Sequence, residues 1–186
     1  DEYPGELYAV GTEAEPILFS SQSGVSGDWE GIYFYPASDS GTSSLRHCVV
    51  EKATYNLVTW AQLSISNCVI RDGGSSFGVQ LRVGAVIDSC TITGLQGVGV
   101  SLMHPESVLR NSSVTLNGGD GVYVSGNGGA VENSVISDNS GAAIRCSSAN
   151  VDVELSGNTY SGNGTEAIVV NSYDGGLWDD ILWEND

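Results

Sequence analysis

The chain has 186 residues, enough for one domain with a real core and too few for two ordinary domains. Hydrophobic residues make up 40% and charged residues only 16%, below the roughly 25% of an average globular domain. Six Lys and Arg against 23 Asp and Glu give a net charge of −17, which excludes a nucleic-acid binder that neutralises phosphates and a basic membrane-surface binder. No apolar run approaches the ~18 residues of a membrane span, so we expect no membrane insertion.

Residues 1–44 predict short strands separated by the longest loops of the chain. The strand patterns lie in the blocks G-E-L-Y-A-V-G-T-E-A-E-P-I-L-F-S-S (Gly5–Ser21) and G-D-W-E-G-I-Y-F (Gly27–Phe34). We interpret residues 1–44 as an opening coil. Because the first residue is Asp, we also expect a processed or excised piece of a longer protein.

From Leu45 onward the sequence repeats. Segments with the pattern aliphatic, polar, polar, small, variable, apolar begin at Leu45, Ile65, Ile87, Leu109, Val131 and Leu155. A second pattern, small–apolar–x–apolar, follows each of the last five, as in G-V-Q-L at Gly78. Three short strands per ~22 residues, separated by Gly, Asn, Asp and Ser, predict an all-β parallel β-helix of about seven coils, with regular coils over 45–172.

Equivalent positions of successive coils then stack at the ~4.8 Å spacing of neighbouring strands. Small residues in the tight turns can hydrogen-bond the same position one coil away, which would fix the bend and the register. Two such rows are expected as structural ladders, and their members include Asn67, Asn111 and Asn133 in one row and Cys48, Cys68 and Cys90 in the other.

Two interpretations of the cysteine row stay open. Neighbouring Cα atoms lie within disulfide range, but side chains in register point parallel, so stacked buried thiols are equally expected. Cys146 replaces an inward aliphatic residue and should be a free core thiol.

Over roughly residues 5–172 the repeats resemble the right-handed parallel β-helix repeat proteins of the pectate-lyase-like superfold. The block Gly5–Phe34 is similar to the first coil of secreted bacterial and archaeal β-helix surface proteins. This resemblance implies a secreted or cell-surface protein. It also implies a right-handed coil, which the crossover rule for parallel strands supports.

In that superfold the ligand groove lies along the strand that matches the small–apolar–x–apolar pattern. Alternation turns its aliphatic residues inward and leaves an outward row. Tyrosine rings can stack on sugars and Arg can pair with carboxylate or sulfate groups, so the row suits an acidic glycan. The candidate glycan groove consists of Tyr33, Tyr35, Gln80, Arg82, Tyr123 and Arg145. An ordinary sheet surface is the alternative. Over residues 54–61 the inward pair is either Val58 and Trp60 or Leu57 and Thr59.

For a lyase, the resemblance implies calcium with Arg, or Lys with Arg, as the groups that act near the sugar C5. Lys52 and Arg71, next to Glu51 and Asp72, would cluster beside another strand, where a surface salt-bridge patch is the simpler interpretation. A polygalacturonase-like hydrolase needs paired aspartates near the groove, and the pair Asp179–Asp180 lies in the tail without the other motifs.

Calcium is the metal for which the loops offer ligands. Asp120, Asp138 and Glu166 lie in Gly- and Asn-rich loops, although none matches an EF-hand or a nonapeptide calcium motif. Turn formation is the competing interpretation. Four cysteines without a C-x-x-C motif, and only two histidines, make a structural zinc site unexpected.

The tail, residues 173–186, breaks the repeat. Leu177, Trp178, Ile181 and Leu182 share one helical face, which predicts a C-terminal cap over the open strands of the last coil. A linker to a further domain is the alternative.

Three functions remain in view from the sequence. The favoured one is an extracellular, non-catalytic β-helix module that serves as a surface scaffold, in adhesion or in glycan binding, with a polysaccharide or cell-surface component as partner. A polysaccharide lyase or another carbohydrate-active enzyme is the alternative, and a structural spacer without a ligand is the third. The oligomeric state stays open.

Overall fold

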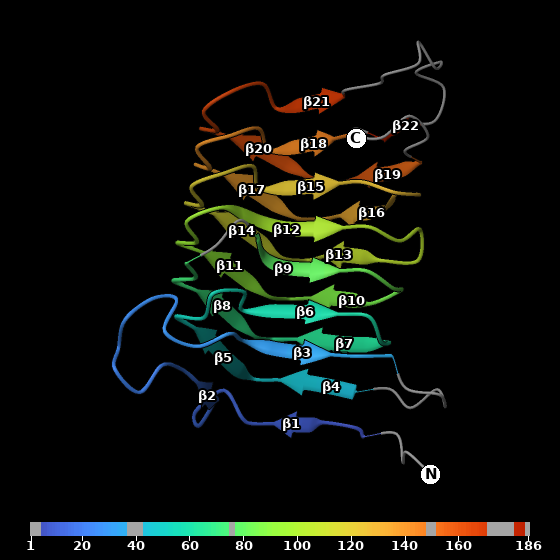
Figure 1. The fold of residues 1–186 in the computed structure, drawn as a ribbon. Helices are drawn as coiled ribbons and strands as arrows, with labels where there is room; N and C mark the ends of the chain where they lie inside the picture. Colours follow the sequence, from blue (N-terminus) through green and yellow to red (C-terminus); the bar gives the residue numbers. More distant parts are fainter. Residues whose placement is uncertain (1–4, 37–42, 75–76, 148–151, 171–180, 185–186) are drawn as a thin grey trace.

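The computed structural model describes residues 5–36, 43–74, 77–147, 152–170 and 181–184. In this part of the chain all the regular structure is β-strand, and each turn of the coil adds one short strand to each of three parallel sheets. Figure 1 shows the coils stacked in chain order, from the blue strands near the N-terminus to the red β21. The predicted all-β parallel β-helix is therefore confirmed. None of the described segments forms a helix with the length and apolarity to cross a membrane.

The three sheets have eight, seven and seven strands, which matches the expected number of coils. The first sheet contains, in order, β1 (Tyr8–Val10), β4 (Ser43–Arg46), β7 (Leu63–Ser66), β10 (Val86–Asp88), β13 (Val108–Arg110), β16 (Gly129–Glu132), β19 (Val153–Ser156) and β22 (Ile181–Glu184). The second sheet contains β2 (Ile17–Phe19), β5 (Cys48–Glu51), β8 (Val69–Arg71), β11 (Thr91–Thr93), β14 (Ser113–Thr115), β17 (Val135–Ser137) and β20 (Thr159–Ser161). The third sheet contains β3 (Ile32–Phe34), β6 (Leu57–Thr59), β9 (Phe77–Leu81), β12 (Val98–Leu102), β15 (Val122–Val124), β18 (Ile144–Cys146) and β21 (Ile168–Val170).

The core follows from the register of these strands. Ile87 of β10 pairs with Ile65 of β7 on one side and with Leu109 of β13 on the other, and all three side chains are fully buried. The third sheet repeats the arrangement with Val79, Val100 and equivalent residues of its other strands. Identical aliphatic positions therefore stack along the inside of the coil, which removes their apolar surface from water.

The row of Asn67, Ser89, Asn111 and Asn133 differs from the expected ladder. These residues are exposed and have positive φ angles between 46° and 56°. Asn tolerates this left-handed conformation better than most residues, so the row makes the sharp turn through its backbone. Asn111 donates a hydrogen bond to Asp88, and no bond between neighbouring Asn side chains of the row occurs in the described residues. Stacked amide bonds were thus the wrong mechanism for this row.

The cysteine row forms hydrogen bonds from coil to coil. The Cys48 N–H points to Sγ of Cys68 at 3.4 Å, and the Cys68 N–H points to Sγ of Cys90 at 3.5 Å. The Cys90 N–H continues the row by donating to Oγ of Ser112 at 3.0 Å. All four cysteines are buried free thiols, and burial raises the pKa of Cys48 and of Cys146 to about 11. The side chain in each turn therefore satisfies a buried N–H of the preceding coil.

A second ladder, which the sequence analysis missed, lies at the next turn. The N–H groups of Leu95, Asn117 and Asn139 each donate to the side-chain oxygen of an Asn one coil later, over 3.1 Å in each case. The acceptors are Asn117, Asn139 and Asn163 in turn. The recurrence of Asn at steps of 22 and 24 residues was the available signal.

The helical face expected in the tail is not seen where the structure describes it, while the expected cap stays a prediction. Ile181–Glu184 form β22, which pairs in parallel with β19 and extends the first sheet, so these residues are a strand and not part of a helix. Leu177, Trp178 and the pair Asp179–Asp180 lie outside the described residues.

Candidate ligand-binding surface

The outward face of the third sheet is where the sequence places a ligand groove. The register resolves the ambiguous coil, because Leu57 pairs with the inward Val79 and Thr59 pairs with the inward Leu81. Leu57 and Thr59 are fully buried, so Val58 and Trp60 belong to the outward rows. Trp60, at the end of β6, also donates its backbone N–H to the carbonyl of Phe34 at 2.8 Å.

Three aromatic rings and one guanidinium gather at the β3 end of this face. The rings of Tyr35 and Trp60 are parallel to within 4°, with centroids 5.4 Å apart. The Tyr33 ring lies 6.2 Å from Tyr35 and 6.4 Å from Trp60, at angles of 17° and 20°. The guanidinium carbon of Arg82 lies 4.9 Å from the Trp60 centroid, a cation–π distance. We call these four residues the aromatic stack.

The order of the strands determines which ring faces are open. β6 lies between β3 and β9, so Tyr35 and Arg82 cover Trp60 from opposite sides. β3 is the edge strand of the third sheet, and Tyr35 is 68% exposed. The uncovered face of Tyr35 is therefore the aromatic face of this column that a ligand can reach.

Arg82 is held by its neighbours and keeps its charge available. Its Nε donates to Oε1 of Gln80 at 2.8 Å, and no carboxylate of the described residues lies within ion-pair distance of it. Gln80 itself is only 8% exposed. The expectation that Gln80 lines an open groove is therefore corrected, because its amide is packed into the sheet surface and positions Arg82.

The other end of the expected groove is occupied by internal contacts. Tyr123 is half-buried, and its ring meets the ring of Phe77 edge to face at 6.0 Å. Arg145 donates from Nε and Nη2 to the two carboxylate oxygens of Asp120, at 2.6 and 2.9 Å. This contact raises the pKa of Arg145. The open candidates thus concentrate at the aromatic stack.

The structure does not bring the three expected calcium ligands together. Asp120 is buried, paired with Arg145, and accepts the Ala142 N–H at 2.7 Å, so its carboxylate has the partners that it needs. Asp138 has φ 56° and forms a left-handed turn, and Glu166 is exposed. In the described ranges no three His, Cys, Asp or Glu side chains are grouped as metal ligands.

The basic residues considered for lyase chemistry are paired with acids. Glu51 is 6% exposed and accepts hydrogen bonds from Arg71 and Ser20 at 2.7 and 2.8 Å, while Lys52 Nζ lies 4.0 Å away. Burial raises the pKa of Glu51, but the hydrogen bonds from Ser20 and Arg71 lower it by more. The pKa of Glu51 is therefore below its ordinary value. This cluster ties β5 to β8 and to the loop after β2.

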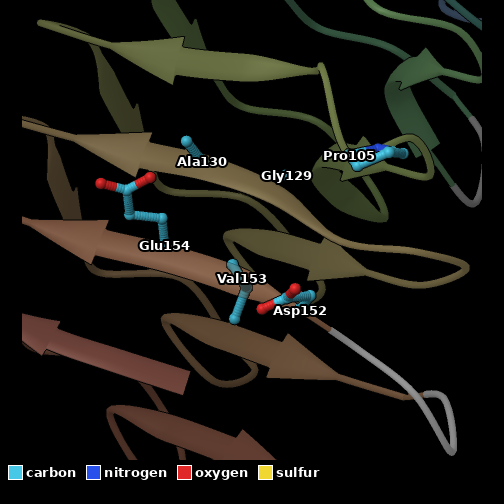
Figure 2. Close-up of a pocket in the computed structure, with 6 residues that line it drawn as sticks. All are labelled: Pro105, Gly129, Ala130, Asp152, Val153 and Glu154. Atoms are coloured by element: carbon cyan, nitrogen blue, oxygen red, sulfur yellow. The ribbon is translucent and has the colours of Figure 1, made fainter. Parts of the chain in front are cut away.

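A hollow of about 310 Å³ lies on the outside of the first sheet, beside β16 and β19. Figure 2 shows its lining of Pro105, Gly129, Ala130, Asp152, Val153 and Glu154. The titratable groups in this lining are two acids, without a basic or nucleophilic partner. The described residues of this lining therefore offer no set of groups for acid–base or nucleophilic catalysis.

Sequence reasoning found Tyr33, Tyr35 and Arg82 but left out Trp60 and Phe77. Leu-Val-Thr-Trp has apolar residues at both alternating sets of positions, so its pattern cannot tell inside from outside. The register with Tyr35 and Arg82 was the available signal, because it places Trp60 between an aromatic residue and a cation.

A family model described as "Right handed beta helix region" matches residues 30–178, which include the aromatic stack. No curated protein and no solved structure matches the chain. The family description agrees with the parallel coils seen in the structure and confirms their expected right-handed sense. It names no ligand.

Proposed function

We propose that this chain, which belongs to the right-handed β-helix family, is a non-catalytic carbohydrate-binding module of an extracellular surface or adhesion protein. The observation that carries the proposal is the aromatic stack of Tyr33, Tyr35 and Trp60 with Arg82. The electron-rich faces of aromatic rings attract the weakly positive C–H groups of a sugar ring. Rings already held by their neighbours lose little freedom when a ligand arrives, which favours binding.

The pairing of the basic residues supports a binding role over lyase chemistry. A lyase base must take a proton from the sugar, so it needs an accessible group with a free lone pair. Arg71 and Lys52 instead form ion pairs with the carboxylate of Glu51. Arg145 is held in the same way by Asp120.

The proposal is tested by screening the purified protein on an array of neutral and acidic glycans and measuring hits by calorimetry. Trp60→Ala and Tyr35→Ala should each weaken binding at least tenfold. Tyr123→Ala is the matched control, because Tyr123 lies on the same sheet and packs against Phe77 outside the stack. This variant should bind as tightly as the unchanged protein. Equal losses for all three variants, or binding untouched by any of them, would count against the stack. Absence of any glycan ligand would end the proposal.

The extracellular part of the proposal has its own test. An antibody against the folded domain should label intact cells of the source organism, and external protease should remove that labelling. Labelling only after the cells are opened would contradict it. The similarity of the opening block to secreted β-helix surface proteins supports this part.

A further inference from the structure

We infer that the glycan site is one sugar ring wide and takes a neutral sugar on the outer face of Tyr35, as the next member of the aromatic stack. This inference rests on the proposed function and goes further, because it replaces a groove along many coils by a single subsite. It names both the number of sugar residues in contact and their charge class.

The first step concerns the faces of the rings. A ring binds a sugar through its face, and Trp60 has one face against Tyr35 and the other against Arg82. Trp60 is also half-buried, so little of its ring is left for a ligand. Tyr35 has one face against Trp60 and belongs to the edge of the sheet, and its 68% exposure leaves the second face open. A sugar ring can therefore extend the aromatic stack by one member, on the outer face of Tyr35.

The second step concerns the coils beyond the stack. An extended glycan along the sheet would next meet Met103 and Ser125, which continue the row of Arg82 and carry neither a ring nor a charge. The neighbouring row continues with Gln80 and Ser101, which are buried. Further along, Tyr123 packs on Phe77 and Arg145 is paired with Asp120. The described residues on this path offer neither an open ring face nor an unpaired charge after Arg82. Extra sugar residues should therefore add little binding energy.

The third step concerns charge. Arg82 lies on the far side of Trp60 from Tyr35, so a sugar on the outer face of Tyr35 is separated from it by two stacked rings. Burial and the charge of Glu30 raise the pKa of Tyr33, so a carboxylate acts on one ring of the stack. A carboxylate can accept hydrogen bonds from sugar hydroxyls but repels acidic sugars. The net charge of −17 acts in the same direction over longer range.

The experiment compares oligosaccharide series of one to six units by calorimetry, with cello-, xylo- and manno-oligosaccharides as neutral probes and oligogalacturonates as the acidic probe. At least one neutral series should bind, with a Kd that changes less than threefold between two and six units. The acidic series should bind at least tenfold more weakly. Tyr35→Ala should weaken binding at least tenfold, Tyr35→Trp should retain it, and Tyr123→Ala, outside the aromatic stack, should change it less than threefold.

The outcomes separate the inference from the proposed function. A Kd that improves tenfold or more from two to six units, or a preference for the acidic series that Arg82→Ala removes, overturns the inference and leaves carbohydrate binding standing. Failure of every series to bind, together with an empty glycan array, removes both. Because Tyr35 is exposed, Tyr35→Ala should keep the melting temperature of the unchanged protein, so lost binding cannot be attributed to unfolding.

Discussion

Arg145 and Asp120 face each other in a bidentate ion pair, with Nε–Oδ2 and Nη2–Oδ1 distances of 2.6 and 2.9 Å. The two residues come from adjacent coils, because Asp120 precedes β15 and Arg145 lies in β18. Their side chains are 27% and 11% exposed, so the pair is mostly shielded from water. The sequence suggested a glycan contact for one residue and a calcium ligand for the other. Their contact gives both a structural role.

Asp120→Ala should destabilise the fold by about 1.5–3 kcal/mol, the usual value of hydrogen bonds to a charged group. The substitution leaves the Arg145 charge and the Ala142 N–H without their acceptor. Urea unfolding followed by circular dichroism measures the loss. Arg110→Ala is the control, since the Arg110–Asp88 pair is more exposed and should contribute at most about 1 kcal/mol. Equal effects of the two variants would contradict this account.

Cys68→Ser should change stability much less than Cys68→Val. Serine can accept the Cys48 N–H as Cys68 does, and Ser112, two coils later, already accepts the Cys90 N–H in the equivalent way. Valine has a similar size but leaves that N–H without a partner, which costs about 1–3 kcal/mol. Thermal unfolding of the two variants provides the comparison. If valine were tolerated as well as serine, the ladder bonds would contribute nothing measurable.

Leu116→Gly should stabilise the protein by up to about 1 kcal/mol. Leu116 has φ 57° and is 65% exposed, so it combines a left-handed backbone with an unburied apolar side chain. The left-handed conformation costs an ordinary residue roughly 1–2 kcal/mol, part of which the greater chain entropy of unfolded glycine offsets. Val135→Gly, at an exposed position inside β17, should instead destabilise. A lower melting temperature for Leu116→Gly would be the contrary result.

Acid should remove the stabilisation that Glu51 supplies. Its pKa is lower in the folded protein than in the unfolded chain, since Ser20 and Arg71 outweigh the effect of burial. The contribution is therefore complete above the unfolded value near 4.5 and is lost as the pH falls through the lower folded value.

Melting temperatures of the unchanged protein and of Glu51→Gln, measured between pH 7 and pH 3, test this point. The gap between the two should be largest at neutral pH and should narrow towards pH 3. Glu154→Gln, at an exposed position of β19, should leave the profile unchanged. A gap that stays constant across the range would show that the Glu51 charge is not responsible.

The coil itself was predictable because a parallel β-helix repeats its inward positions. Leu45, Ile65 and Ile87 recur at nearly regular steps and thereby indicate the core positions. Their stacking could be predicted without information from distant parts of the chain. The side-chain partners were less accessible. Asp120 and Arg145 are 25 residues apart, and nothing in their local pattern distinguishes a turn acid and a surface Arg from a pair.

The aromatic stack shows the same limit. Alternation identified Tyr33 and Tyr35 as outward residues, but a row of outward residues does not say which ring faces are covered. That depends on the order of β3, β6 and β9, which makes Trp60 the middle of the column and Tyr35 its end. The exposed asparagine row was misread for a related reason, since Asn serves both in left-handed turns and in buried ladders.

The coil-to-coil bonds of the cysteine row mean that the length of the protein can change only in steps of one coil. Each bond joins positions one coil apart, so removing residues 90–111 would bring Ser112 to the place of Cys90 and let it accept the Cys68 N–H. The solenoid would shorten by one strand spacing, ~4.8 Å, while the aromatic stack keeps its neighbours. A deletion of half that length would instead put inward residues of one sheet into the turns of the next. The distance between the aromatic stack and the last coil is thus adjustable only in steps of one coil.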